Sequence, residues 1–102
     1  MSNEPTAIQS VAVVGAGQMG AGIAQVAARA GLAVTLSDQA ESQAAAAVTK
    51  LAGRLRRQEA DGKIPAGSTD ELVGRIRTGG PLFGVGEADL VIEAAPEQLE
   101  LK

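Results

Sequence analysis

The sequence of 102 residues contains no cysteine, histidine, tryptophan or tyrosine, and its only aromatic residue is one phenylalanine. Without cysteine, the chain can form no disulfide bond and offers no thiolate to a metal or a substrate. Without histidine and tyrosine, it lacks two of the side chains that commonly move protons in catalysis. We therefore expect neither a catalytic residue nor a metal-binding cluster in this chain.

The charge and hydropathy of the chain argue against two further classes of protein, nucleic-acid-binding proteins and membrane proteins. Twelve acidic and nine basic residues give a net charge of −3. Because the chain has neither a general basic surface nor aromatic platforms for bases, we expect no nucleic-acid partner. No apolar run approaches the roughly 20 residues that cross a bilayer, and residues 1–7 lack the regions of a signal peptide. We therefore expect one modest globular domain in the cytoplasm, with no membrane partner.

Glycine is abundant, with 13 residues, and three of them form a motif, Gly15-x-Gly17-x-x-Gly20. The motif follows the apolar run 11–14, which is typical of a buried strand, and precedes a helical pattern. In a dinucleotide-binding turn, the first glycine permits the tight turn and the second lets the backbone approach a pyrophosphate. The third lets the helix pack closely on the sheet. The start of that helix directs unpaired N–H groups toward the phosphates.

An acidic residue supports the same interpretation of the motif. A second predicted strand, 33–37, ends at Asp38, about 20 residues after Gly17. The dinucleotide-binding fold places a carboxylate against the adenosine ribose at this position. A strand, turn and helix without a ligand, followed by a surface aspartate, is the alternative.

Periodicity and capping signals predict the remaining elements. We expect a capping box in which Ser68 caps a short helix and Glu71 reaches back, and a loop over 79–86. Strands are predicted at 9–14, 33–37, 75–78 and 89–95, and helices at 18–30, 41–58, from residue 68 to 73, and from residue 97 onward.

This order of elements predicts an α/β fold, a Rossmann-like doubly wound parallel sheet with a helical hairpin between the second and third strands. The doubly wound rule places the strands in the spatial order 3-2-1-4. The chain then supplies the first half of the fold and the fourth strand. We expect residues 1–102 to be one dinucleotide-binding domain that is truncated at its C-terminal side.

A basic stripe lies along the predicted helix 41–58. Lys50, Arg54 and Arg57 fall on the face opposite its apolar stripe. Such a stripe is usually a solvated face, and the alternative is a patch that meets the phosphates of a substrate.

Three blocks of the sequence resemble the NAD-binding domain of the 3-hydroxyacyl-CoA dehydrogenases, including the 3-hydroxybutyryl-CoA type. These blocks are residues 13–25, with the run Met-Gly-Ala-Gly-Ile-Ala, then Asp38, and residues 88–102. The resemblance implies NAD as cofactor, and Glu97 and Lys102 as contacts to it. Local physics alone would make Glu97 a first-turn acid of a helix and Lys102 an exposed end. The residues expected to bind NAD are Gly15, Ala16, Gly17, Gln18, Met19, Gly20, Asp38, Glu97 and Lys102.

The resemblance also implies an activity for the full-length protein. It would oxidise a 3-hydroxyacyl-CoA to the 3-oxoacyl-CoA with hydride transfer to NAD, while a histidine takes the hydroxyl proton. That histidine, and the helical domain through which the family dimerises, lie beyond this chain, so we expect a dimer only with that domain. The family also places a serine and a lysine on the second helix for coenzyme A, and this sequence departs there, with Arg54 and Asp61.

Other functions remain open at this point. A β-hydroxyacid dehydrogenase or an imine reductase shares the glycine motif, but many of these take NADP, which favours arginine over Asp38. FAD-binding folds share the glycines and the acid. A third alternative is a truncated, non-catalytic nucleotide-binding module.

Overall fold

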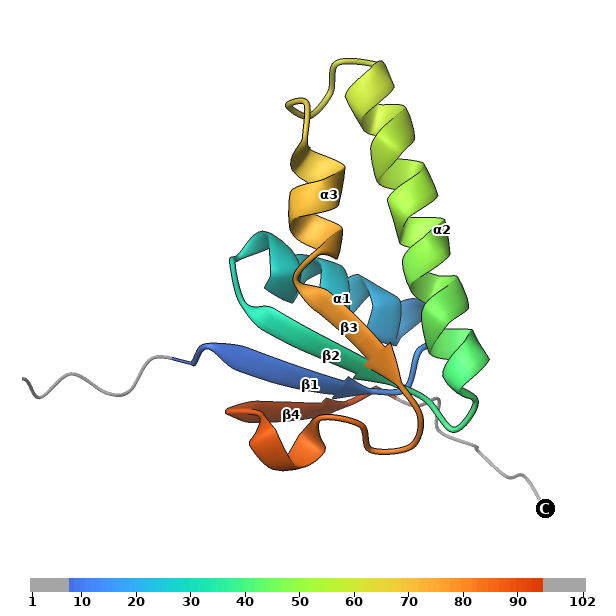
Figure 1. The fold of residues 1–102 in the computed structure, drawn as a ribbon, viewed down its shortest axis with the longest axis vertical. Helices are drawn as coiled ribbons and strands as arrows, with labels where there is room; N and C mark the ends of the chain where they lie inside the picture. The colour runs from blue at the N-terminus through green and yellow to red at the C-terminus, as the bar shows by residue number, and fades with distance from the viewer. Residues whose placement is uncertain (1–7, 95–102) are drawn as a thin grey trace, which may run out of the picture.

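The computed structural model describes residues 8–94, which form four strands and three helices (Figure 1). The predicted element types are confirmed for the described residues, with bounds that either agree or shift by one or two residues. In chain order the elements are β1 (Ser10–Val14), α1 (Gln18–Arg29), β2 (Ala33–Ser37), α2 (Glu41–Ala60), α3 (Ser68–Val73), β3 (Ile76–Gly79), the 3₁₀ turn η1 (Val85–Glu87) and β4 (Leu90–Glu93). The helix predicted after Pro96 lies outside the described residues.

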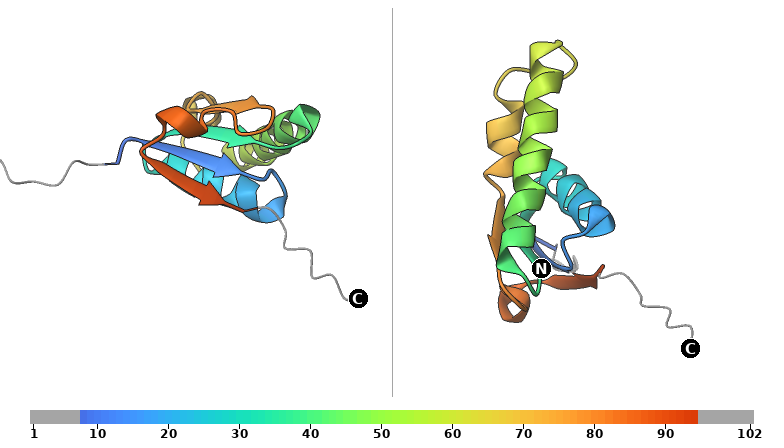
Figure 2. Two further views of the ribbon diagram at one scale, coloured as in Figure 1. Left: turned by 90° about the horizontal axis from the view of Figure 1, so that it is seen from below. Right: turned by 90° about the vertical axis from the view of Figure 1, so that its right-hand side faces the viewer.

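The strands form one parallel sheet in the order β3-β2-β1-β4 (Figure 2). The predicted spatial order is therefore confirmed, as is the Rossmann-like α/β class. In a parallel sheet all carboxyl ends meet at one edge. The turn after β1 and the residue after β2 thus lie next to each other, although they are far apart in sequence.

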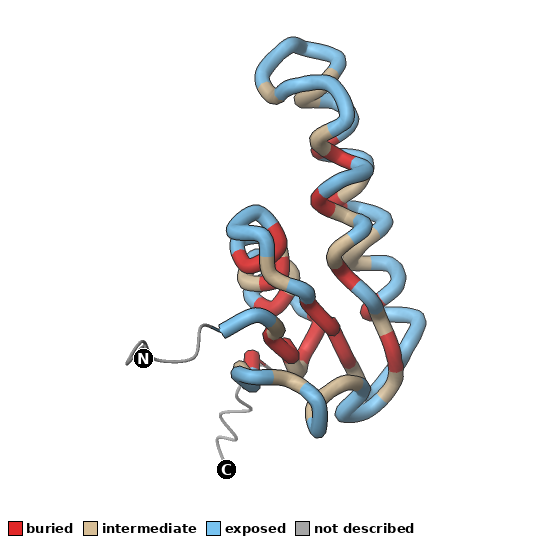
Figure 3. Tube along the Cα trace, turned by 60° about the vertical axis from the view of Figure 1, so that its left-hand side comes forward, coloured by how far each residue is buried: buried red, intermediate tan, exposed pale blue. Residues whose placement is uncertain are grey.

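The hydrophobic core lies between the sheet and the helices, and buried segments follow the inner faces of both layers (Figure 3). Alternate residues of β1 and β2 point into it, as expected for strands that are covered by helices. α1 contributes alanines, whose small side chains let this helix lie close to the sheet. The principal core side chains are Val11, Val13, Ala24, Ala28, Val34, Leu36, Leu51, Leu55 and Leu72.

The connection from β3 to β4 lies against the side of β2 opposite to the core. Thr35 alternates with the core residues Val34 and Leu36, and a Cβ placed on Gly84 would collide with the Thr35 side chain. Gly84 also has a φ of +80°, which favours glycine. The predicted glycine-rich loop is confirmed, and it includes the single turn η1.

The predicted capping box at α3 is wrong. Gly67 is the N-cap residue, and no side chain of the box makes a cap bond. The Ser68 hydroxyl donates instead to the Pro65 carbonyl at 2.6 Å, and Glu71 pairs with the Arg75 guanidinium at 3.6 Å.

Glu59, near the end of α2, caps α3 in place of that box. Its carboxylate accepts hydrogen bonds from the Thr69 N–H at 2.7 Å and the Gly67 N–H at 3.2 Å. The Thr69 side chain and these two N–H groups hold the pKa of Glu59 below its ordinary value. A residue from the other arm of the helical hairpin thus supplies the acceptor, which local sequence rules cannot anticipate.

Candidate functional site

The glycine turn after β1 is fastened to the end of β2 by two hydrogen bonds. The Gly15 N–H donates to the Ser37 carbonyl at 2.8 Å, and the Ala16 N–H donates to Asp38 Oδ2 at 2.8 Å. Gly15 has a φ of +108°, a conformation that side chains rarely adopt. The predicted turn residue and the predicted acid are therefore direct neighbours.

Gly17 and Gly20 have different surroundings. Gly17 is the N-cap residue of α1 with a φ of −75°, and a Cβ built on it would meet no atom within 4 Å. A Cβ on Gly20 would collide with the Gly15 carbonyl and would lie 3.5 Å from Val13 Cγ1. Gly20 is therefore required for packing inside the domain, whereas Gly17 leaves open space outside it.

The N-terminus of α1 is left without a cap. It has no side-chain cap bond and no acidic residue in its first turn. Among residues 8–94, the N–H groups of Gln18, Met19 and Gly20 have no hydrogen-bond acceptor. Free N–H groups and the positive end of the helix dipole favour an anion. α3, by contrast, receives the Glu59 carboxylate.

Asp38 is half-buried beside this helix end and keeps its charge. Its Oδ2 accepts from Ala16 and its Oδ1 accepts from the Ala40 N–H at 3.1 Å. These two backbone bonds lower the pKa of Asp38 from its ordinary value, so the carboxylate is ionised at neutral pH. Because an ionised carboxylate can accept about four hydrogen bonds, two positions remain for the hydroxyls of a ligand.

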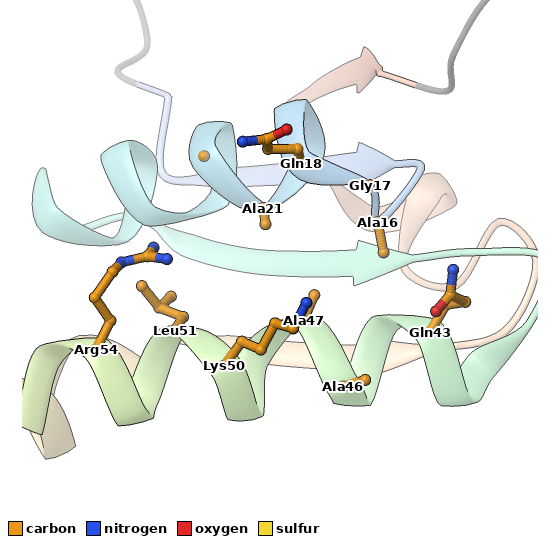
Figure 4. A pocket seen from close by; sticks show the side chains of 11 residues that line it. Ala16, Gly17, Gln18, Ala21, Gln43, Ala46, Ala47, Lys50, Leu51 and Arg54 are labelled. Carbon is orange, nitrogen blue, oxygen red and sulfur yellow. The ribbon is translucent and has the colours of Figure 1, made fainter.

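A groove of about 760 Å³ continues from the glycine turn along the space between α1 and α2 (Figure 4). Small side chains on both helices leave this space open, and Lys50 and Arg54 of α2 line it. The Arg54 guanidinium donates to Gln25 of α1 at 3.3 Å. Arg57, the third member of the predicted stripe, is not among the lining residues. Sequence reasoning found the basic stripe, but the groove depends on how the two helices pack.

The structure gathers the predicted residues from Gly15 to Gly20 together with Asp38, while Glu97 and Lys102 lie outside the described residues. Met19 is 66% exposed. Residues 8–94 contain no group of His, Cys, Asp or Glu side chains that could hold a metal ion. In the same part of the chain, every helix is too short or too polar to cross a membrane.

The fold and this site define a Rossmann-type dinucleotide-binding domain: a glycine turn, an uncapped helix start and an acid after the second strand. Comparison with known proteins specifies the family. Residues 10–102 match the family described as "3-hydroxyacyl-CoA dehydrogenase, NAD binding domain". The chain belongs to this family, and its cofactor is NAD. This family match decides against the alternatives that the sequence left open, namely a β-hydroxyacid dehydrogenase, an imine reductase and an FAD-binding fold.

Individual relatives agree with this assignment. The chain is 41% identical over 96 residues to a 3-hydroxybutyryl-CoA dehydrogenase of Mycobacterium tuberculosis, covering 94% of this chain and 34% of the relative. It is 40% identical over 95 residues to a 3-hydroxyadipyl-CoA dehydrogenase of Escherichia coli, covering 93% of this chain and 20% of the relative. The crystal structure of 3-hydroxybutyryl-CoA dehydrogenase from Escherichia coli superposes with a TM-score of 0.84 at 38% identity, covering 90% and 20% of the two chains. The chain thus spans between 20% and 34% of the length of these relatives.

Proposed function

We propose that NAD binds with its pyrophosphate at the start of α1, over Gly15–Gly20, and with its adenosine ribose at Asp38. The observation that carries this proposal is the uncapped N-terminus of α1 beside an ionised carboxylate. The open space at Gly17 lets a phosphate approach the backbone. The resemblance adds Glu97 and Lys102 as further contacts to NAD.

We also propose that this domain serves, within a longer protein, the oxidation of a 3-hydroxyacyl-CoA to the 3-oxoacyl-CoA. The relatives named as 3-hydroxybutyryl-CoA and 3-hydroxyadipyl-CoA dehydrogenases support this activity. Bound NAD accepts the hydride. The residues of this chain bind and orient the cofactor, and a base from outside the chain takes the hydroxyl proton. Dimerisation, in this proposal, also requires the longer protein.

The specificity for NAD over NADP tests the role of Asp38. The ionised carboxylate accepts hydrogen bonds from ribose hydroxyls and repels a 2′-phosphate, so calorimetry is expected to show tighter binding of NAD. Asp38→Ala is expected to weaken NAD binding by roughly 1–3 kcal/mol, the usual cost of unmade polar contacts. Equal or tighter binding of NADP to the unmodified protein would remove Asp38 from the ribose site.

The variant Asp38→Asn tests the charge of Asp38 separately from its hydrogen bond to the Ala16 N–H. The amide oxygen can still accept from the Ala16 N–H, so the glycine turn stays fastened, while the negative charge and the bond from the Ala40 N–H are lost. The preference for NAD over NADP is expected to shrink in this variant. An unchanged preference would mean that the charge of Asp38 does not select the cofactor.

The acyl-CoA substrate is proposed to place phosphates in the groove between α1 and α2. Coenzyme A carries a 3′-phosphate and a diphosphate, and Lys50 and Arg54 supply cations at the groove wall. Both side chains are exposed. Each is therefore expected to contribute only about 0.2–1 kcal/mol, less at high salt.

Calorimetry with coenzyme A and with dephospho-coenzyme A, which lacks the 3′-phosphate, tests this placement. Lys50→Ala and Arg54→Ala are expected to weaken the binding of coenzyme A and to narrow its advantage over the dephospho form. Arg57→Ala removes a cation from the same helix outside the groove and is the matched control. If all three substitutions weaken binding equally, the groove is not the phosphate site.

A further inference from the structure

One side-chain hydrogen bond joins the two helices that enclose the groove. Arg54 Nη2 on α2 donates to Gln25 Oε1 on α1 at 3.3 Å, and Figure 4 shows the Arg54 side chain directed from α2 toward α1. Gln25 follows Ala21 and Gly22 by about one turn of α1, and both of those residues line the groove. The bond therefore marks the end of the groove that lies furthest from the glycine turn.

This bond holds Arg54 without neutralising its charge. Gln25 is half-buried and offers a neutral amide oxygen as the acceptor. Arg56, two positions further along α2, is instead paired with the Asp70 carboxylate at 3.4 Å. A guanidinium carries several N–H donors in a planar fork, and the amide oxygen engages one of them. Arg54 thus keeps its positive charge and its remaining donors for an anion.

The lining of the groove is cationic. Among the described residues that line it are Lys50 and Arg54 and no carboxylate, although the whole chain has a net charge of −3. Lys50 lies four residues before Arg54 on α2, so the two cations are neighbours on one face of the helix. A cleft lined by charge of one sign attracts a ligand of the opposite sign. The far end of the groove is therefore suited to a phosphate group.

We propose that Gln25 is a positioning residue for the 3′-phosphate of coenzyme A, because it holds the Arg54 guanidinium at the far end of the groove. An arginine that is ordered before binding loses less side-chain entropy when the phosphate arrives. The planar guanidinium then donates two parallel hydrogen bonds to phosphate oxygens. The proposal rests on the proposed function, which places phosphates of the acyl-CoA substrate in this groove. Arg54 stands where the resemblance implies a serine, so Gln25 acts on a residue at which this sequence departs from the family.

Calorimetry with Gln25→Met tests the positioning, because methionine keeps the length of the side chain and removes the amide acceptor. The advantage of coenzyme A over dephospho-coenzyme A, expressed as the ratio of their Kd values, is expected to fall about two- to threefold. This is within what one exposed cation contributes. Gln25→Glu is expected to lower the ratio further, since a carboxylate would pair with Arg54 and repel the phosphate.

A double-mutant cycle links the effect to Arg54. In the Arg54→Ala background, Gln25→Met is expected to leave the ratio unchanged, because no guanidinium remains to be held. Gln58→Met, on α2 outside the groove lining, is the matched control and is also expected to leave the ratio unchanged. An equal effect of Gln25→Met with and without Arg54 would overturn the proposal, as would an equal effect of Gln58→Met.

The order of the Arg54 side chain measures the positioning without any ligand. NMR relaxation of the arginine side-chain N–H groups is expected to show Arg54 as more ordered than Arg57, which lies outside the groove lining. Gln25→Met is expected to remove this difference. If Arg54 and Arg57 are equally disordered in the unmodified chain, Gln25 does not position the guanidinium.

This proposal and the proposed coenzyme A site fail in different ways. If the unmodified chain binds coenzyme A no better than dephospho-coenzyme A, the groove is not the phosphate site and both fail. If Arg54→Ala narrows the advantage and Gln25→Met does not, the site stands and only the role of Gln25 is overturned. A loss of NAD binding in Gln25→Met would show that Gln25 supports the structure of α1, and would overturn its role at the phosphate.

Discussion

Gly17→Val is expected to abolish the binding of NAD while the domain stays folded. The Cβ of residue 17 would enter open space, so no atom of the protein resists it. The same space is where the pyrophosphate is proposed to approach the start of α1, and a branched side chain fills it. The φ of −75° is accessible to valine, so no backbone strain follows. Calorimetry with NAD and thermal unfolding together measure the two effects.

Gly20→Val is the informative contrast. Its Cβ would collide with the Gly15 carbonyl, so the turn and α1 must move apart. Overpacking of this kind typically costs about 1–3 kcal/mol, and more where backbone is struck. Gly53→Val, on α2 where a Cβ meets nothing within 4 Å, controls for valine in a helix. If Gly17→Val binds NAD normally, the turn does not hold the phosphates. If it unfolds like Gly20→Val, the two glycines share one structural role.

The order of the strands could be predicted because local and global signals agree. The run 11–14 is short and apolar, and the segment 33–37 has the length of a strand. Gly15 and Gly31 mark turns, and the right-handed crossover rule leaves few topologies. The bounds of α3 were predicted correctly, but the group that caps its start could not be predicted. Its cap is Glu59, which is brought there by the turn between α2 and α3. The sequence pattern at Ser68 predicted that the Ser68 side chain accepts from the first N–H groups of α3. In the structure the Glu59 carboxylate accepts from these N–H groups instead.

Part of the candidate site could likewise be predicted from the sequence, and part of it could not. The glycine motif and Asp38 are readable from spacing, because the fold brings the end of β2 to the turn after β1. The bond from Ala16 to Asp38 depends on atomic positions and carries no sequence signal. The groove along α2 could not be predicted from the sequence either. The groove exists because small residues of α1 and α2 face each other beside Lys50 and Arg54. Which residues face each other depends on how the two helices pack.

The 102-residue chain by itself is expected to produce no NADH from 3-hydroxybutyryl-CoA, even with saturating NAD. Hydride transfer needs the nicotinamide held against the substrate carbon, and proton transfer needs a base within hydrogen-bond reach. The chain contains no histidine. Asp38 cannot replace one, because its carboxylate is engaged by two backbone N–H groups that lower its pKa further. A carboxylate is in general a poor base for an alcohol at neutral pH, because free aspartate and glutamate side chains titrate near pH 4.

The same arrangement predicts how the cofactor is held. The turn at Gly15–Gly20 and Asp38 contact the adenosine diphosphate end in the proposed pose, so ADP-ribose is expected to bind about as well as NAD. A spectrophotometric assay of NADH, with Gly17→Val as the control, measures the activity, and competition calorimetry measures the affinities. NADH formation above the control would show that this chain contains its own base and would exclude a non-catalytic module. Much tighter binding of NAD than of ADP-ribose would place nicotinamide contacts within these 102 residues.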